Sequence, residues 1–221
     1  MRLAITAAIA ALLALPGIAA ASDIKFELKT DTGVRFGSPH RAAGTLTDDA
    51  GAPAAGQAIE LQARPFPYKG SFKKVATAKT GADGRFTFKR LFDRDVELRA
   101  VAAALSVTSV TRHAYVFPRI HLSFEQLSGG RLRLIQTLRT PKDVRLSAPV
   151  IFYLGSGNAK TAPPTAKAKP RRTAPGRFRA SAKVMLPKAW KGSFRYGSCF
   201  KYSRGSGMGD PNATCPTRYR F

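Results

Sequence analysis

Apolar and polar residues alternate in short runs along most of this chain. Between residues 44 and 88, the runs Ile59-Glu-Leu61 and Phe86-Thr-Phe88 place an apolar side chain at every second position, and each run follows a turn rich in Asp and Gly. A period of two is typical of a strand with one buried face, and Asp-Gly sequences supply the positive φ that tight turns require. This region therefore predicts antiparallel hairpins.

The same pattern predicts seven strands in the first half of the chain. They are expected near residues 24–28, 41–47, 57–64, 72–79, 85–89, 96–103 and 106–116. The Ala-rich run from Val96 is assigned to a strand because Val96, Leu98 and Ala100 keep the period of two and β-branched residues follow. Seven short strands separated by turn residues are typical of an immunoglobulin-like sandwich.

A second series of strands follows Pro118. Its members are expected near residues 120–124, 132–134, 150–154, 178–186 and 193–202. We therefore predict an all-β protein with two consecutive Ig-like or prealbumin-like antiparallel β-sandwich domains, residues 22–117 and 118–221. Residues 159–176 are rich in Pro and Lys and poor in large apolar side chains, so they are expected to form an exposed, mobile loop.

The first residues resemble a secretory signal. A positive start is followed by an apolar run from Leu3 to Leu15, a Pro-Gly break and three small residues before Ser22. We expect residues 1–21 to be removed on export, because the apolar run is shorter than the roughly 20 residues of a membrane span. The mature chain is then expected to lack a transmembrane segment and to be secreted, periplasmic or held in the cell envelope.

Positive charge dominates the second half of the chain. The 221 residues carry a net charge of +24, and residues 126–221 contain 20 Lys and Arg against two acidic residues. Such a region attracts polyanions in a salt-dependent way. The eligible partners are teichoic acid, lipopolysaccharide, anionic lipid and extracellular nucleic acid. The alternative is that a high genomic GC content raises the number of arginines, and that the resulting charge merely keeps the exported protein soluble.

The candidate polyanion-binding residues lie where cations are densest in this half. The set is Lys160, Lys167, Lys169, Arg171, Arg172, Arg177 and Arg179, together with Trp190. Trp190 lies in a predicted turn between Pro187 and Gly192, so it is the candidate for an exposed stacking residue. Alternation assigns the other aromatic residues of this half to the core.

Cys199 and Cys215 are the two cysteines of the chain. In an exported protein two cysteines predict a disulfide, and closing this Gly-rich loop stabilises the fold by about 3 kcal/mol on the chain-entropy estimate. A nucleophilic role for Cys199 requires a histidine base nearby, and the three histidines all lie before residue 122.

Catalytic and metal-binding patterns are missing from the sequence. The three histidines do not have the spacing of a zinc site, Asp210 is alone in its loop, and no Gly-x-Ser-x-Gly motif occurs. Asp48 with Asp49, and Asp93 with Asp95, are better explained by turn formation than by calcium binding. We expect no catalytic residues, no metal and no cofactor.

The turn and strand residues of the first half resemble a known family. The carboxypeptidase regulatory-like, prealbumin-like β-sandwich of secreted bacterial proteins has a signature similar to Gly44, Leu46, Asp48 or Asp49, Gly51, Pro53, Gly56, Ala58, Ile59, Leu61, Asp83, Gly84 and Phe86. The resemblance implies a transthyretin-like fold and a non-catalytic spacer or adhesion role. One departure is Phe92-Asp-Arg-Asp95, where the family has Gly-x-Tyr before its last strand. The tail from Tyr196 to Cys215 resembles uncharacterised two-domain secreted proteins of high-GC soil bacteria.

Two functions of different classes follow from these observations. The first is a non-enzymatic exported module that attaches to anionic polymers or surfaces through the basic second half. The second is a structural spacer or assembly subunit that binds another protein by adding a strand at an open sheet edge. The oligomeric state is not specified by either reading.

Overall fold

The computed structural model describes residues 25–48, 50–190, 193–200, 205–210, 212 and 215–220. The expected signal segment, residues 1–21, lies outside this part of the chain. Regular structure in the described residues consists of β-strands and short 3-10 turns, which are η1 Ala103–Leu105, η2 Ser128–Gly130 and η3 Lys188–Trp190. The prediction of an all-β fold is confirmed. No described helix is long and apolar enough to cross a membrane.

The first half of the chain forms two sheets that enclose one hydrophobic core. Its strands are β1 Lys25–Thr30, β2 Gly33–Arg35, β3 His40–Thr47, β4 Ala58–Pro65, β5 Lys73–Lys79, β6 Arg85–Arg90, β7 Val96–Ala102, β8 Val107–Thr108 and β9 Arg112–Phe117. One sheet has the order β1-β3-β6, and the other has the order β2-β9-β7-β4-β5 with β8 paired to β7. The pairing of β2 with β9 is parallel, and the remaining pairs are antiparallel.

Side-chain alternation builds this first core as the sequence predicts. Ile59 and Leu61 of β4 and Phe86 and Phe88 of β6 are all buried in the same cluster. The turn before β6 depends on Gly84, whose φ is +71°, because a Cβ there would lie 2.4 Å from the Leu46 carbonyl oxygen. Period-two burial and a glycine turn together therefore fix this hairpin.

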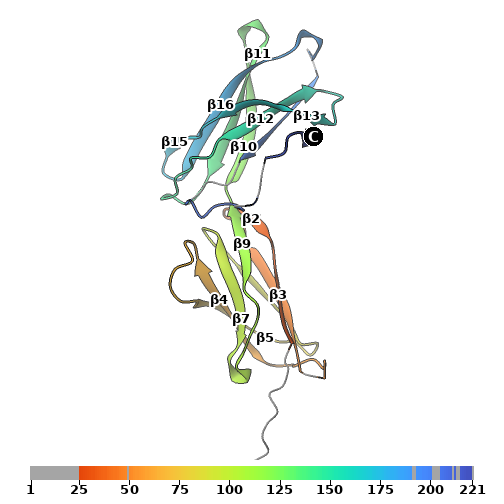
Figure 1. The fold of residues 1–221 in the computed structure, drawn as a ribbon, viewed down its shortest axis with the longest axis vertical. Helices are drawn as coiled ribbons and strands as arrows, with labels where there is room; N and C mark the ends of the chain where they lie inside the picture. Colours follow the sequence, from red (N-terminus) through yellow and green to blue (C-terminus); the bar gives the residue numbers. More distant parts are fainter. Residues whose placement is uncertain are drawn as a thin grey trace, which may run out of the picture.

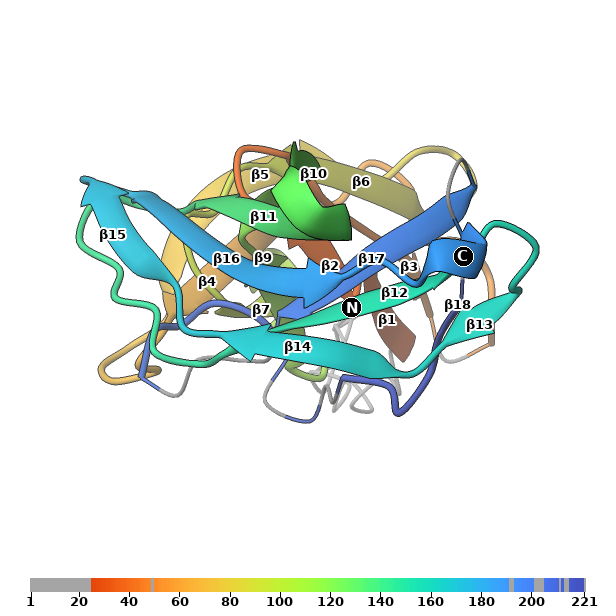
Figure 2. The same cartoon turned by 90° about the horizontal axis from the view of Figure 1, so that it is seen from above.

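The second half forms a second core between two further sheets. Its strands are β10 Arg119–Leu127, β11 Arg131–Arg139, β12 Val150–Ser156, β13 Thr161–Ala162, β14 Pro164–Ala168, β15 Arg171–Ala174, β16 Arg177–Met185, β17 Phe194–Phe200 and β18 Tyr219–Arg220. The order β10-β11-β16-β15 makes one layer, β14-β12-β17 makes the other, and β13 pairs with β18. The two layers are seen from above in Figure 2.

The prediction of a loop over residues 159–176 is wrong. This segment forms β13, β14 and β15, although most of its side chains are exposed. β14 pairs with β12, and after Pro170 the chain crosses to the other layer, where β15 pairs with β16. An edge strand is held mainly by its main-chain hydrogen bonds, so small inward residues such as Ala166 and Ala168 are sufficient. The low apolar content of the segment was therefore a misleading signal.

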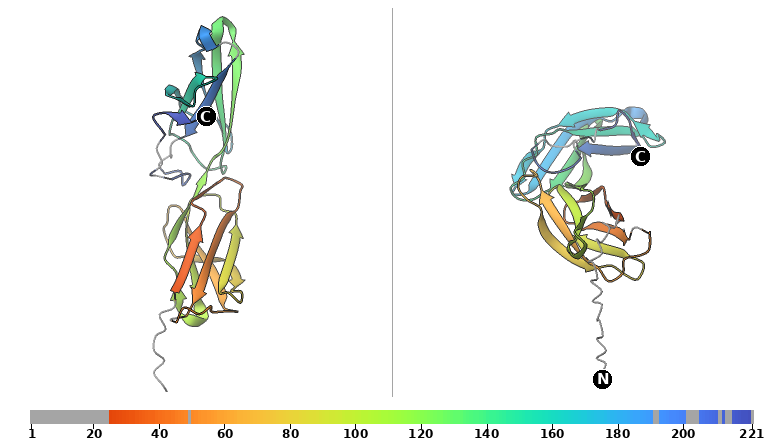
Figure 3. Two further views of the ribbon diagram at one scale, coloured as in Figure 1. Left: turned by 90° about the vertical axis from the view of Figure 1, so that its right-hand side faces the viewer. Right: turned by 60° about the horizontal axis from the view of Figure 1, so that its bottom comes forward.

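The two cores are stacked along the long axis of the molecule (Figures 1 and 3). The backbone passes between them where β9 ends at Phe117 and β10 begins at Arg119. Phe92 packs against both cores, and the side chains of Arg94 and Asp143 form an ion pair between the two halves. The boundary near Pro118 is compatible with these contacts, and the division into two domains stays a prediction.

A buried carboxyl group ties the C-terminal segment to this junction. Asp95 is 1% exposed, and its Oδ1 accepts hydrogen bonds from the backbone N–H groups of Val116 at 2.7 Å and Gly209 at 3.2 Å. The Asp95 N–H donates to the Gly207 carbonyl at 2.8 Å. Burial raises the pKa of Asp95 to about 7, with a smaller contribution from Asp210, and the two backbone hydrogen bonds oppose the rise.

The predicted disulfide between Cys199 and Cys215 is confirmed. The two Cα atoms are 5.6 Å apart, and both cysteines pack beside a small cluster of Ile151, Tyr153 and Ala162 on the outer face of β12. The Tyr153 hydroxyl donates a 2.6 Å hydrogen bond to the Pro216 carbonyl. The disulfide therefore holds the C-terminal residues against the outside of the second layer.

We predict that ionisation of Asp95 destabilises the fold as pH rises. Because the folded-state pKa is about 7 and the ordinary value is 3.8, the unfolded chain loses its proton first between these values. Stability contributed by the neutral carboxyl is complete below about pH 4 and is lost as pH rises through 7, by at most about 4 kcal/mol. Asp95→Asn keeps an acceptor oxygen and cannot ionise. Melting temperatures of wild type and variant should therefore diverge between pH 5 and pH 8 in favour of the variant; parallel curves would contradict the assignment.

Removal of the disulfide should lower stability without unfolding the strands. The bridged residues are 16 apart in sequence, so a Cys199→Ala, Cys215→Ala double variant should lose about 3 kcal/mol of unfolding free energy. Urea titration followed by circular dichroism measures this loss. Wild type in reducing buffer is the matched comparison and should reproduce the variant. A loss under about 1 kcal/mol would contradict the chain-entropy estimate and would mean that the unfolded reduced chain keeps residual structure.

A candidate anion-binding face

The outer surface of the β10-β11-β16-β15 sheet carries a dense group of cations. Along β11 and β16 the even-numbered residues are mostly buried and face the second core, so the odd-numbered ones face away from it. We call the outward side the basic face. Its cations are Arg119, Arg131, Arg133, Arg139, Arg171, Arg177, Arg179 and Lys183.

Strand register places several of these cations directly opposite one another. Arg139 of β11 lies opposite Arg119 of β10 on one side and opposite Arg177 of β16 on the other. Arg171 lies opposite Arg179 in the same way. Cross-strand pairs have Cβ atoms about 4.5–5.5 Å apart, and like charges in such pairs are destabilising. The row of Arg119, Arg139 and Arg177 therefore costs stability in the free protein, and an anion bound across it would offset that cost.

One acidic residue lies in these four strands. The Glu125 carboxylate of β10 accepts hydrogen bonds from Arg133 at 2.7 Å and from Arg179 at 3.2 Å, so it neutralises part of the charge of these two arginines. The row of Arg119, Arg139 and Arg177 makes no ion pair with a described acidic residue. The excess charge is therefore concentrated at the end of the sheet near the junction.

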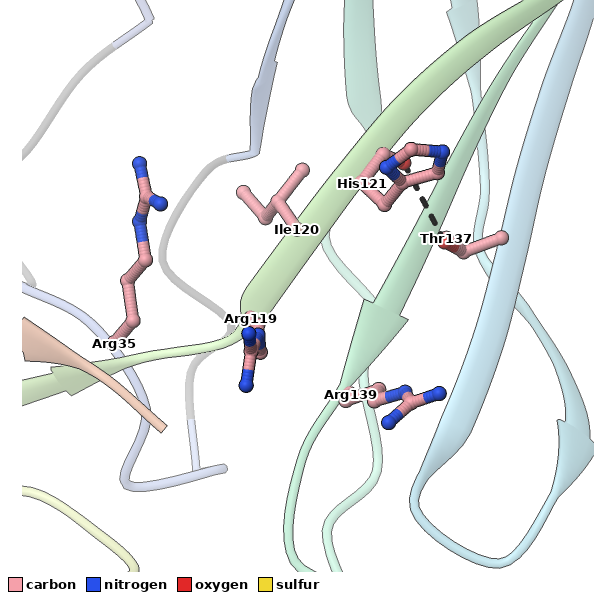
Figure 4. A pocket seen from close by; sticks show the side chains of 6 residues that line it. All are labelled: Arg35, Arg119, Ile120, His121, Thr137 and Arg139. Carbon is pink, nitrogen blue, oxygen red and sulfur yellow. Dashed lines mark hydrogen bonds between the residues drawn. The ribbon is translucent and has the colours of Figure 1, made fainter. Parts of the chain in front are cut away.

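Two hollows lie on the basic face. The first has a volume of about 480 Å³ and is shown in Figure 4, where Arg35 of β2 approaches from the first half of the chain and the other side chains come from β10 and β11. Its lining residues are Arg35, Arg119, Ile120, His121, Thr137 and Arg139. The Thr137 hydroxyl donates a 3.4 Å hydrogen bond to the His121 carbonyl, drawn dashed in Figure 4.

The second hollow has a volume of about 510 Å³ and lies between β11, β16 and β15. It is lined by Arg133, Arg171, Thr173, Arg179, Ser181 and Lys183. Guanidinium forks combined with hydroxyl donors suit phosphate, sulfate or carboxylate oxygens. Both hollows therefore present donors to an anion, and they lie on one side of one sheet.

The structure brings together only part of the site that the sequence suggested. Arg171, Arg177 and Arg179 lie on the basic face. Arg172 instead donates a 2.6 Å hydrogen bond to the Lys142 carbonyl, so its guanidinium has a structural partner.

The three predicted lysines do not join these arginines. Lys167 of β14 is opposite Ile151, whose neighbour Phe152 faces the second core, so Lys167 points outward from the other layer. Lys169 follows β14, and Lys160 lies in the turn before β13. Lysines 160, 167 and 169 are therefore exposed cations that lie outside the basic face.

Trp190 is half-buried and packs against the second core from η3. The expectation of an exposed stacking residue is wrong, because the 3-10 turn folds the indole back onto the sandwich. The other aromatic residues follow the alternation, with Phe194 and Tyr196 partly buried against the same core.

Five cations of the basic face were missed by the sequence reasoning. They are Arg119, Arg131, Arg133, Arg139 and Lys183. The signal for them lies in the alternation of β11, which reads Arg-Leu-Arg-Leu: the leucines predict a buried row and the arginines an exposed one. The polar half of the same alternation identifies the face.

The histidines are distributed separately. His40 is buried in the first half, where desolvation lowers its pKa, and His113 Nε2 lies 3.4 Å from Glu97 Oε1. His121 is exposed on the basic face. The described residues contain no group of three or more His, Cys, Asp or Glu side chains placed to hold a metal ion.

Comparisons with known proteins give no family. No protein-family model and no curated protein matches the chain. The solved structures that it resembles include Escherichia coli alpha-2-macroglobulin in its native conformation, with a TM-score of 0.38 and 12% identity over 89% of this chain and 16% of that one. A mutant of Salmonella alpha-2-macroglobulin gives a TM-score of 0.36 and 11% identity over 84% of this chain and 16% of that one. The chain thus spans about a sixth of these proteins, and similarity at this level carries no functional argument.

Proposed function

We propose that this protein is a non-enzymatic, exported module that attaches to anionic polymers through the basic face. The observation that carries the proposal is the row of Arg119, Arg139 and Arg177, which register holds side by side without an acidic partner in the described residues. A surface shaped only by solubility mixes charges of both signs, because opposed like charges reduce stability. Teichoic acid, lipopolysaccharide, anionic lipid and nucleic acid share the chemistry that this row suits, a surface of repeated phosphates.

Export is supported by the disulfide and by the signal-like residues 1–21. Disulfides form and persist mainly in oxidising compartments outside the cytoplasm. The first half, which we assign to the carboxypeptidase regulatory-like type on its turn residues, would then act as a spacer. The two halves are stacked along the long axis of the molecule (Figure 1), so the first half would extend the chain away from the sheet that carries the basic face.

A matched pair of triple variants tests the basic face against net charge. Arg119→Ala, Arg139→Ala, Arg177→Ala removes the arginine row, and Lys160→Ala, Lys167→Ala, Lys169→Ala removes the same charge elsewhere. Polyphosphate affinity is measured at several salt concentrations. The row variant should make the negative slope of log affinity against log salt shallower by about 2–3, and the lysine variant should make it shallower by less than about 1.

The same two triple variants also distinguish a loss of polymer binding from a loss of folding stability. Removing opposed arginines should leave the melting temperature unchanged or raise it slightly, because repulsion is relieved. Equal losses of polyphosphate affinity in both triple variants would show that overall charge, and not this face, attracts the polymer, and the proposal would then fail.

Glu125 is expected to limit binding. Glu125→Gln removes the negative charge that Arg133 and Arg179 share, so both guanidinium groups become available to phosphate. The variant should elute from a phosphate-bearing column at higher salt than wild type. Glu60→Gln is the control, because Glu60 pairs with Lys74 in the first half and its removal changes net charge equally. Identical shifts in both variants would exclude a local role for Glu125.

A further inference from the structure

Strand β10 presents a long open edge. It is nine residues long, and in the described chain it pairs only with β11. Ile120, Leu122 and Phe124 of its inward-facing row are apolar, and Ile120 and Phe124 remain 39% and 41% exposed. A long strand edge with exposed apolar side chains is a site at which another strand can pair.

Aromatic packing fixes the shape of this edge. The Phe124 ring lies 5.1 Å from the Phe194 ring and 5.2 Å from the Tyr196 ring, both by centroids, and both contacts are edge-on. These rings connect β10 of one layer to β17 of the other without a strand between them. The inner side of the edge is therefore a fixed apolar surface that an added strand would cover.

The sequence of β10 is complementary to itself when reversed. It reads Arg-Ile-His-Leu-Ser-Phe-Glu from Arg119 to Glu125. We propose that a second copy of the chain pairs antiparallel with β10, with Leu122 of each copy on the twofold axis. In this register Arg119 lies opposite Glu125 of the second copy and Ile120 lies opposite Phe124.

Each of these pairs occurs twice because the interface is isologous. Opposite charges and apolar pairs directly across an antiparallel ladder are stabilising. Arg119 makes no ion pair with a described residue, and the Glu125 carboxylate, which is 44% exposed, has lone pairs beyond those used by Arg133 and Arg179. The charges on the two copies are therefore complementary at both ends of the paired segment.

Other registers lose this complementarity. A shift by one residue places Ile120 opposite Glu125 and exchanges the two faces. A shift by two residues in either direction separates Arg119 from Glu125. The period of the sheet and the order of charges along β10 thus select one register.

Pairing in this way would join the two four-stranded sheets edge to edge. Residues opposite one another in a ladder share a face, so the basic faces of both copies would lie on the same side. This consequence rests on the proposed function, because two joined faces would bind one polymer with higher avidity than either face alone. The dimer itself does not depend on polymer binding and is tested without it.

Charge inversion tests the pairing by sedimentation velocity over a range of protein concentrations, without polymer and in moderate salt. R119E leaves acids at both positions of the ladder, and E125R leaves cations at both, so each variant should dimerise at least tenfold more weakly than wild type. The double variant R119E/E125R should regain the dimer. An equimolar mixture of the two single variants should form a heterodimer, since their charges complement each other.

A cross-link tests the same register without changing charge. Leu122→Cys places two thiols on the twofold axis, where the Cα separation of about 4.5–5.5 Å suits a disulfide. Ser123→Cys is the control, because residue 123 faces residue 121 of the second copy. Covalent dimer is expected for Leu122→Cys alone, with Cys199–Cys215 intact.

Three results would overturn the proposal. They are a wild-type protein that stays monomeric at all concentrations, a dimer that survives both single inversions unchanged, and equal cross-linking at positions 122 and 123. Polyphosphate affinity of the same samples is measured separately. A monomer that binds polyphosphate refutes the dimer alone, and a dimer that does not bind refutes the proposed function alone.

Discussion

The side-chain period of two is the constraint on which this structure depends. In β11 and β16 it sorts every residue into one of two rows, so the same strands that fill the second core with leucine, phenylalanine and valine must carry their cations on the opposite surface. Pairing then converts spacing along the chain into spacing across the sheet. Arg119 and Arg177 are distant in sequence, and Arg139 stands between them because all three occupy one line of the ladder. The candidate site is thus a product of register.

The repulsion among the opposed arginines costs stability, and this cost supports a binding function for the basic face. A folded chain gains nothing by aligning three arginines, and it has one carboxylate on these four strands with which to compensate. Placement of Glu125 away from the row leaves the junction end most positive. His121, Thr137 and Arg35 surround that end, so the donors there come from both halves of the chain.

Several features were predictable from the sequence because they depend on local signals. Alternation identified most strands, turn residues identified the first hairpins, and two cysteines identified the disulfide. The strands of residues 159–176 were not predictable from apolar content, because a sheet edge is held by main-chain groups that every residue except proline supplies. In the sequence, Asp95 is part of a departure from a family pattern and of an aspartate pair assigned to a turn, and neither indicates a buried carboxyl group. Its partner Gly209 is 114 residues away, and no local signal reports such a contact.

The C-terminal segment has a mechanical consequence for the junction. In the described chain the backbone passes between the two halves at Pro118, and residues 207–209 span the same place through Asp95 and Val116. Because the disulfide joins Cys199 to Cys215, this segment belongs to a closed covalent ring anchored on the second half. The two halves are thus connected twice. The first connection is the backbone at Pro118, and the second is the set of hydrogen bonds made by residues 207–209, which belong to the loop closed by the disulfide. Two connections side by side resist twisting and bending more than one does. While the hydrogen bonds of residues 207–209 remain intact, the molecule should therefore transmit force along its length as a stiff rod.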